Sequence, residues 1–185
     1  MAGDSVKMLQ ELPPGSVDLA AFDPPYNIGQ KYDYYNDKRA KDEYLDWARK
    51  WLHGVYRALT MTGSFWLVIN DELVSEMDVL AKQAGFYKRS HVIWYYTFGQ
   101  NSPKKLTPSH AHLLYYVVNR DKFTFNVDKL KVPSARSLVY KDKRAKEGGR
   151  LPDDTWILRP QWFPGAFESG EDTWTLARVC GTFNE

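Results

Sequence analysis

VDLAAF at residues 17–22, followed directly by DPPY at residues 23–26, is the stretch of this sequence that decides the fold. Gly15 and Ser16 precede the apolar run, and the prolines end it because proline has no amide hydrogen to donate to a neighbouring strand. The pattern predicts a buried β-strand. Ligands of open α/β sheets bind beyond the carboxyl ends of strands, which makes the tetrapeptide a candidate site. On its own it is equally compatible with a rigid turn, since Asp and Pro are common turn residues.

Helices and strands are expected to alternate on both sides of this stretch. Residues 27–41 form a polar, tyrosine-rich loop, and residues 42–60 carry the clearest helical pattern. Its apolar positions recur every three or four residues: they are Leu45, Ala48, Leu52, Val55 and Leu59. The other expected elements are helix 5–12, strand 65–69 in a largely parallel sheet, helix 71–84 ended by Gly85, strand 86–96, loop 97–109 and strand 113–118, paired with 122–125. This alternation predicts an α/β fold with right-handed crossovers.

From about Pro133 the periodicity fades and charges cluster, which predicts an irregular appendage. Its basic cluster consists of Lys141, Lys143, Arg144, Lys146 and Arg150, with Lys129, Lys131 and Arg136 just before it. Two interpretations stay open at this point. The cluster contacts phosphates, or it is an ordinary solvated loop. Because the net charge is only +2, any nucleic-acid contact has to be local.

Composition excludes several other classes of protein. Apolar residues make up 43% and charged residues 26%, which is ordinary for a globular chain and argues against disorder. A single cysteine, Cys180, excludes an internal disulfide and a cysteine-rich zinc site. His110 and His112 are interpreted as strand-lining residues, and we expect no metal. Without a signal pattern or a membrane-length apolar run, a soluble cytoplasmic protein is expected.

Further motifs along nearly the whole chain accompany the tetrapeptide. They are Gly3-Asp4 followed by Leu9, the stop at Leu12-Pro13, Ser16-Val17-Asp18-Leu19, Asn27 after Tyr26, the helix with Trp47 and Trp51, Gly63-Ser64, and His112-Leu113-Leu114-Tyr115. Together they resemble the DNA adenine-N6/cytosine-N4 methyltransferase family, in the permuted group whose catalytic motif precedes the cofactor motif. The resemblance implies a class I (Rossmann-like) methyltransferase sheet, S-adenosylmethionine as methyl donor and double-stranded DNA as substrate, as in restriction-modification systems.

The chemistry of methylating an amino group explains the tetrapeptide. The exocyclic nitrogen of adenine is a poor nucleophile because its lone pair is delocalised into the ring. The Asp23 carboxylate and the Pro24 carbonyl would accept hydrogen bonds from its two N–H groups. These bonds would favour a tetrahedral nitrogen, whose lone pair is localised toward the methyl group. Tyr26 would stack on the flipped-out base, and Pro25 and Asn27 would shape the substrate pocket. Asp rather than Ser at position 23 resembles adenine-N6 more than cytosine-N4 enzymes, which remain the alternative.

The resemblance also divides the chain. Residues 1–125 would be the catalytic part of the methyltransferase domain, and residues 126–185 a target-recognition region with a truncated connection to the cofactor-binding part. Phosphate contacts are expected from two groups of basic residues: Lys104 and Lys105 in the loop, and Lys141, Lys143 and Arg144 in the cluster. Asp4 is either a cofactor contact or the N-cap of the first helix.

The chain departs from the family in one respect. The permuted group carries a His-Pro segment and a glycine-rich cofactor loop after the recognition region, and no glycines here have the G-x-G spacing. We therefore expect a sheet that is incomplete at its C-terminal part. Three explanations stay open. The chain is a truncated product, or half of a split enzyme completed by a second polypeptide, or a non-catalytic remnant with only a DNA- or partner-binding role.

Overall fold

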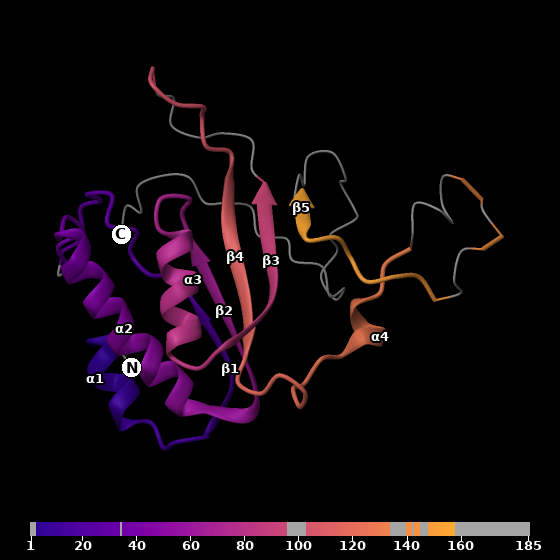
Figure 1. Ribbon diagram of the computed structural model, residues 1–185, viewed down its shortest axis with the longest axis horizontal. Helices are drawn as coiled ribbons and strands as arrows, with labels where there is room; N and C mark the ends of the chain where they lie inside the picture. The colour runs from indigo at the N-terminus through magenta and orange to yellow at the C-terminus, as the bar shows by residue number, and fades with distance from the viewer. Residues whose placement is uncertain are drawn as a thin grey trace. The chain divides into compact units, whose positions relative to one another are not determined.

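The computed structural model describes residues 3–33, 35–95, 103–133, 140–141, 143–144 and 148–157 (Figure 1). The chain divides into two compact units, which are described separately. The first comprises Met1–Ile93 and Ala111–Thr124, and the second comprises Trp94–His110 and Phe125–Glu185. The elements, in chain order, are α1 (Ser5–Glu11), β1 (Val17–Phe22), α2 (Lys41–Ala58), β2 (Leu59–Ile69), α3 (Val74–Gln83), β3 (Tyr87–Tyr95), β4 (His110–Val117), α4 (Val127–Leu130) and β5 (Thr155–Ile157).

The sheet of the first unit has the strand order β1-β2-β4-β3. β1 runs parallel to β2, with Phe22 paired to Leu67, whereas β2 runs antiparallel to β4, with Leu67 paired to Leu114. The α/β class is confirmed, but the expectation of a largely parallel sheet was wrong. An apolar run such as FWLVI shows that a strand is buried without showing which way its neighbours run. Residues 122–125 form no strand. Instead, the Thr124 amide donates to the Thr62 carbonyl at 3.0 Å.

The helices of the first unit cover one face of this sheet (Figure 1). Of the apolar positions that the periodicity predicted for this helix, Ala48, Leu52 and Val55 are at most 1% exposed, Leu45 is half-buried, and Leu59 begins β2 instead. Tyr44 and Trp51, which the pattern did not include, are also at most 1% exposed. They pack in one core with Phe65 and Leu67 of β2 and with Leu114 and Tyr116 of β4. Burying each large apolar side chain contributes about 1.5–3 kcal/mol, so this interface stabilises the first unit.

The ends of α1 are held by two charged side chains. Asp4 Oδ1 accepts the Val6 amide at 2.8 Å and the Lys7 amide at 3.3 Å, which confirms the N-cap interpretation. At the other end Arg57 Nη2 donates to the carbonyls of Leu9, Gln10 and Leu12, at 2.6, 3.1 and 2.8 Å. Arg57 thus satisfies carbonyls that a helix end leaves without an intrahelical partner.

Gly85 ends α3 as predicted. It follows the C-cap Ala84 with a φ of +110°, which glycine adopts without strain, and the Tyr56 ring leaves no room there for a Cβ. None of the helices in the described ranges has the length and apolar character needed to cross a bilayer.

β1 is less buried than expected. Asp18, Leu19 and Ala21 are exposed, and the exposed fraction of Leu19 is 62%. Within the described residues β1 pairs only with β2, so it is an edge strand of this sheet. The prediction of a buried strand was therefore wrong. Apolar composition indicates what a strand can bury, whereas the neighbouring elements determine what it does bury.

Candidate functional site

The DPPY tetrapeptide lies where the sequence predicted, directly beyond the carboxyl end of β1. Because Phe22 pairs with Leu67 in the parallel register, Asp23 and Pro24 come level with the last residues of β2, which ends at Ile69. This edge of an α/β sheet is where ligands bind. The Asp23 side chain is exposed at it, and Pro24 is buried beneath.

Within the tetrapeptide, the Tyr26 hydroxyl donates a hydrogen bond to Asp23 Oδ1 at 2.5 Å. The ring of Tyr26 is partly buried against the core. An ionised carboxylate has two oxygens and about four acceptor positions, so this bond leaves acceptor capacity for another donor. The site therefore combines an exposed, acceptor-only group with an aromatic ring whose position is tied to it.

Tyr44 of α2 supports the tetrapeptide from the core. Its hydroxyl donates to the Pro25 carbonyl at 2.7 Å, and its side chain is fully buried. Burial, followed by the charges of nearby residues, raises the pKa of Tyr44, so it remains a donor at neutral pH. The bond takes the carbonyl of Pro25 and not that of Pro24, which we predicted as the second acceptor. The helical periodicity placed Tyr44 on a helix without indicating this partner.

The loop after the tetrapeptide is organised by Asp37, which is only 2% exposed. Its carboxylate accepts the amides of Asn27, Ile28 and Gln30 at 2.8, 3.2 and 2.9 Å. These bonds compensate the cost of burying a carboxylate. Sequence reasoning treated Asp37 as one polar residue of a loop, and nothing local in the sequence indicates which amides it binds.

Asn27 was predicted to bind substrate, and its side chain is engaged within the same loop. Asn27 Oδ1 accepts the Arg39 amide at 2.8 Å, and Nδ2 donates to the Arg39 carbonyl at 3.0 Å. Its φ of +57° lies in the left-handed region, where asparagine is one of the better tolerated residues. Asn27 and Asp37 together turn the chain sharply after Tyr26.

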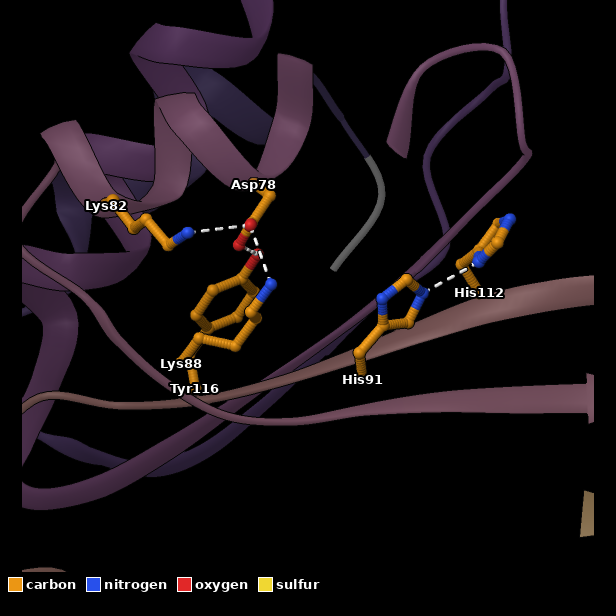
Figure 2. A network of polar contacts seen from close by, with 6 residues as sticks. All are labelled: Asp78, Lys82, Lys88, His91, His112 and Tyr116. Carbon is orange, nitrogen blue, oxygen red and sulfur yellow. Dashed lines mark hydrogen bonds and ion pairs between the residues drawn. The ribbon is translucent and has the colours of Figure 1, made fainter. Parts of the chain in front are cut away.

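A second polar cluster joins α3 to β3 and β4, and Figure 2 shows it. Asp78 accepts from Lys82 at 2.8 Å, from Lys88 at 2.7 Å and from the Tyr116 hydroxyl at 2.9 Å. Burial alone would raise the pKa of Asp78, but these three hydrogen bonds outweigh it and lower that pKa. Burial and the Asp78 charge raise the pKa of Tyr116. The cluster fastens α3 to the sheet.

A histidine pair lies in the same view (Figure 2). His91 Nε2 and His112 Nδ1 are 2.7 Å apart, so one ring donates and the other accepts. His112 is 8% exposed and pairs with Ile69, which places it at the same edge of the sheet as the tetrapeptide. The strand-lining interpretation of His112 is confirmed, and the pairing with His91 was not anticipated.

The remaining predicted residues belong to other parts of the chain. Lys104, Lys105, Lys141, Lys143 and Arg144 are exposed and belong to the second unit. Arg136, Lys146 and Cys180 lie outside the described residues. Asp4 belongs to the first unit, where it caps α1.

Comparison with known proteins adds to this geometry. A family model described as DNA methylase matches residues 17–175. The type II methyltransferase M.HpaI of Haemophilus parainfluenzae is 30% identical over 157 residues, which cover 84% of this chain and 49% of that protein. The DNA adenine methyltransferase YhdJ of Escherichia coli (strain K12) is 27% identical over 162 residues, covering 83% of this chain and 55% of YhdJ. The chain thus spans about half the length of the curated relatives that it matches.

Among solved structures, the Thermus thermophilus protein TTHA0409, complexed with S-adenosyl-L-methionine, aligns with a TM-score of 0.54 at 19% identity. The alignment covers 71% of this chain and 59% of that one. At this identity the likeness concerns the fold alone.

Proposed function

This chain belongs to the DNA methylase family, and from that premise we propose that it is the base-binding part of a DNA methyltransferase. The reaction would move a methyl group from S-adenosylmethionine to N6 of a flipped-out adenine in double-stranded DNA. The observation that carries the proposal is the position of Asp23, Pro24 and Tyr26 at the carboxyl edge of β1, with Tyr26 bonded to Asp23. The choice of adenine is supported by Asp at position 23 and by the relative YhdJ, a DNA adenine methyltransferase.

The chemistry assigned to this chain is on the side of the base. The second oxygen of Asp23 and the Pro24 carbonyl accept the two amino hydrogens and direct the lone pair of the nitrogen outward. Because the nitrogen becomes strongly acidic as it gains a bond, an ordinary carboxylate suffices to take up its proton. Tyr26 stacks on the extruded base, and Pro25 and Asn27 hold the backbone around it.

The methyl donor is only partly accounted for by the described residues. The complex of TTHA0409 with S-adenosyl-L-methionine supports this donor. The sequence has no G-x-G spacing, however, and Gly15 and Gly29, the positive-φ glycines nearest the tetrapeptide in sequence, face open space. Asp4, proposed as a contact for the donor, is engaged as a helix cap. We therefore propose that the donor pocket is completed by further chain or by a second polypeptide.

Contacts to the DNA backbone are proposed for basic residues of the second unit: Lys104, Lys105, Lys141, Lys143 and Arg144. All five are exposed, as phosphate-binding residues must be. Residues 126–185 would hold the target-recognition region. Phosphate contacts supply affinity and register, whereas reading the target sequence requires contacts to base edges.

The test is to incubate the purified chain with tritiated-methyl S-adenosylmethionine and duplex DNA, and to separate the nucleosides of the digested product. Where the donor pocket is complete, label in N6-methyladenine is the expected result, and label in N4-methylcytosine would replace adenine with the alternative substrate. Titration calorimetry with S-adenosylmethionine accompanies it. DNA binding without label or donor binding fits either a donor pocket that a second polypeptide completes or a non-catalytic DNA-binding half, and only in the first case would the missing part restore labelling.

A further inference from the structure

Tyr32 stands out in the loop that follows the tetrapeptide. Lys31 and Asn36 form an antiparallel β-bridge, so Tyr32 and Tyr35 lie in a short hairpin. Tyr32 is 47% exposed. A large aromatic side chain kept in solvent on a loop beside a candidate site is a candidate ligand contact, because connecting segments carry function disproportionately.

The exposed ring of Tyr32 is the outer end of a continuous series of aromatic contacts. Its ring centroid is 6.0 Å from that of Tyr35, which is 5.6 Å from Trp47. The series continues from Trp47 to Trp51 at 6.0 Å and from Trp51 to Phe22 at 5.4 Å. Phe22 is the residue directly before Asp23. The series therefore connects the surface ring through the core to the start of the tetrapeptide.

Arg39 adds rigidity to the exposed part of this series. Its guanidinium lies 4.6 Å from the centroid of the Tyr35 ring and 5.5 Å from that of Trp47. The Arg39 backbone is bonded at both its amide and its carbonyl to the Asn27 side chain. Together with the three amides held by Asp37, these contacts fix the base of the hairpin relative to Tyr26. The Tyr32 ring is therefore presented on a preorganised support, which lowers the entropic cost of a contact.

The Tyr32 hydroxyl is influenced by burial and by two carboxylates. Burial first, and then the negative charges of Asp37 and Asp23, raise the pKa of the Tyr32 hydroxyl. Tyr32 remains protonated at neutral pH and offers both a flat ring and a hydrogen-bond donor.

We propose that Tyr32 is a second aromatic contact for the extruded base, beside Tyr26, with the hairpin as its support. The inference rests on the proposed function, since it concerns the base that Asp23 and Pro24 would bind. Stacking on an aromatic ring is largely independent of base identity. Tyr32 therefore contributes to holding any extruded base and contributes nothing to intact duplex.

The experiment measures binding of the full chain to duplexes that carry 2-aminopurine, a fluorescent adenine analogue. In one duplex the analogue is mismatched, because a mismatched base is extruded at least cost whatever the recognition sequence. In a second duplex it sits fully paired at the same position, and in a third it is the paired neighbour of a mismatch. Affinity and the fluorescence of the bound analogue are recorded for each.

Tyr32→Ala is expected to weaken binding of the mismatched duplex by roughly five- to 150-fold, the range for loss of one stacked base. Its bound analogue should be brighter than with the wild-type chain, because an aromatic quencher is removed. Binding of the fully paired duplex should change less than about twofold. Tyr32→Phe should retain wild-type behaviour. Tyr87→Ala is the matched control, because Tyr87 is 49% exposed on β3.

The outcomes separate this inference from the function beneath it. Loss of mismatch capture in Tyr26→Ala but not in Tyr32→Ala overturns the role of Tyr32 alone. A wild-type chain that captures no mismatched base overturns the proposed function and this inference with it. The inference would also be overturned if Tyr32→Ala changed the signal only of the third duplex, in which the analogue is the paired neighbour of a mismatch. If Tyr32→Ala unfolds, Tyr32→Leu keeps an apolar contact with Tyr35 and is judged by the same selectivity.

Discussion

The hydroxyl of Tyr26 donates to Asp23 Oδ1 over 2.5 Å, so the aromatic ring and the carboxylate of the tetrapeptide are mechanically coupled. In the proposed function the ring stacks on the base while the carboxylate accepts from its amino group. The bond between them would then align two contacts to one ligand. It also separates two roles of Tyr26 that mutation can test independently.

Tyr26→Phe retains the ring and removes the hydroxyl, whereas Tyr26→Ala removes both. We expect Tyr26→Phe to capture a mismatched 2-aminopurine within about twofold of wild type. In Tyr26→Ala the affinity for the mismatched duplex should fall by roughly five- to 150-fold, because base stacking is worth about 1–3 kcal/mol. Overall affinity for paired duplex should change little in either variant. Equal capture by Tyr26→Ala and wild type in a fluorescence titration would contradict the stacking role.

Asp23→Ala removes the acceptor assigned to the amino group. Methyl transfer in any form that turns over should fall below detection, while affinity for DNA stays within a few-fold, because phosphate contacts come from other residues. A filter-binding assay with tritiated donor measures the first and fluorescence anisotropy the second. Asp18→Ala on β1 is the control, since Asp18 is also exposed and bonds only to Thr60 among the described contacts. Near-normal turnover in Asp23→Ala would remove Asp23 from the mechanism.

Asp37→Ala leaves the amides of Asn27, Ile28 and Gln30 without their acceptor. The free energy of unfolding should fall by about 1–3 kcal/mol, because hydrogen bonds to a charged group contribute more than neutral ones. Mismatch capture should fall as well, because the turn after Tyr26 loses its anchor. Urea denaturation measures the first effect. Asp33→Ala in the same loop is the control, and its exposed side chain predicts a change below about 0.5 kcal/mol.

Asp78→Asn tests a pH-dependent contribution to stability. The pKa of Asp78 is lowered in the folded state, so its charge stabilises the fold above the unfolded value of about 3.9 and ceases to do so as pH falls through the folded value. At pH 7 the free energy of unfolding of the variant should be about 1–3 kcal/mol lower than that of the wild-type chain. Below about pH 4 the difference should shrink. A difference that stays constant from neutral to acidic pH would be inconsistent with the lowered pKa.

The exposed ion pair of Asp46 and Arg49 supplies the control for that experiment. Asp46 is 66% exposed, and such pairs are worth between about 0 and 1 kcal/mol. Asp46→Asn should therefore leave the denaturation curve nearly unchanged at neutral pH. An Asp46 effect as large as that of Asp78 would show that the assay reports net charge and not the buried cluster.

The sequence was sufficient for features that depend on residues a few positions apart. The repeat in α2 predicted which face is buried, Asp4 could be identified as a helix cap, and Gly85 marked the end of α3. The tetrapeptide was located at the carboxyl end of β1 in the same way. Each follows from local geometry: a helix brings every third or fourth residue to one face, and a cap bonds to amides two or three residues away.

Only the tertiary structure decided how distant segments meet. The direction of β4, the bond from Tyr44 to Pro25 and the amides chosen by Asp37 join positions that the chain brings together by reversing direction. The exposure of β1 depended on its neighbours, and the series of rings from Tyr32 to Phe22 on the packing of α2. A local pattern specifies which groups need partners. The partners themselves are selected by packing between segments remote in sequence, where burial makes an unmatched polar group too costly to leave.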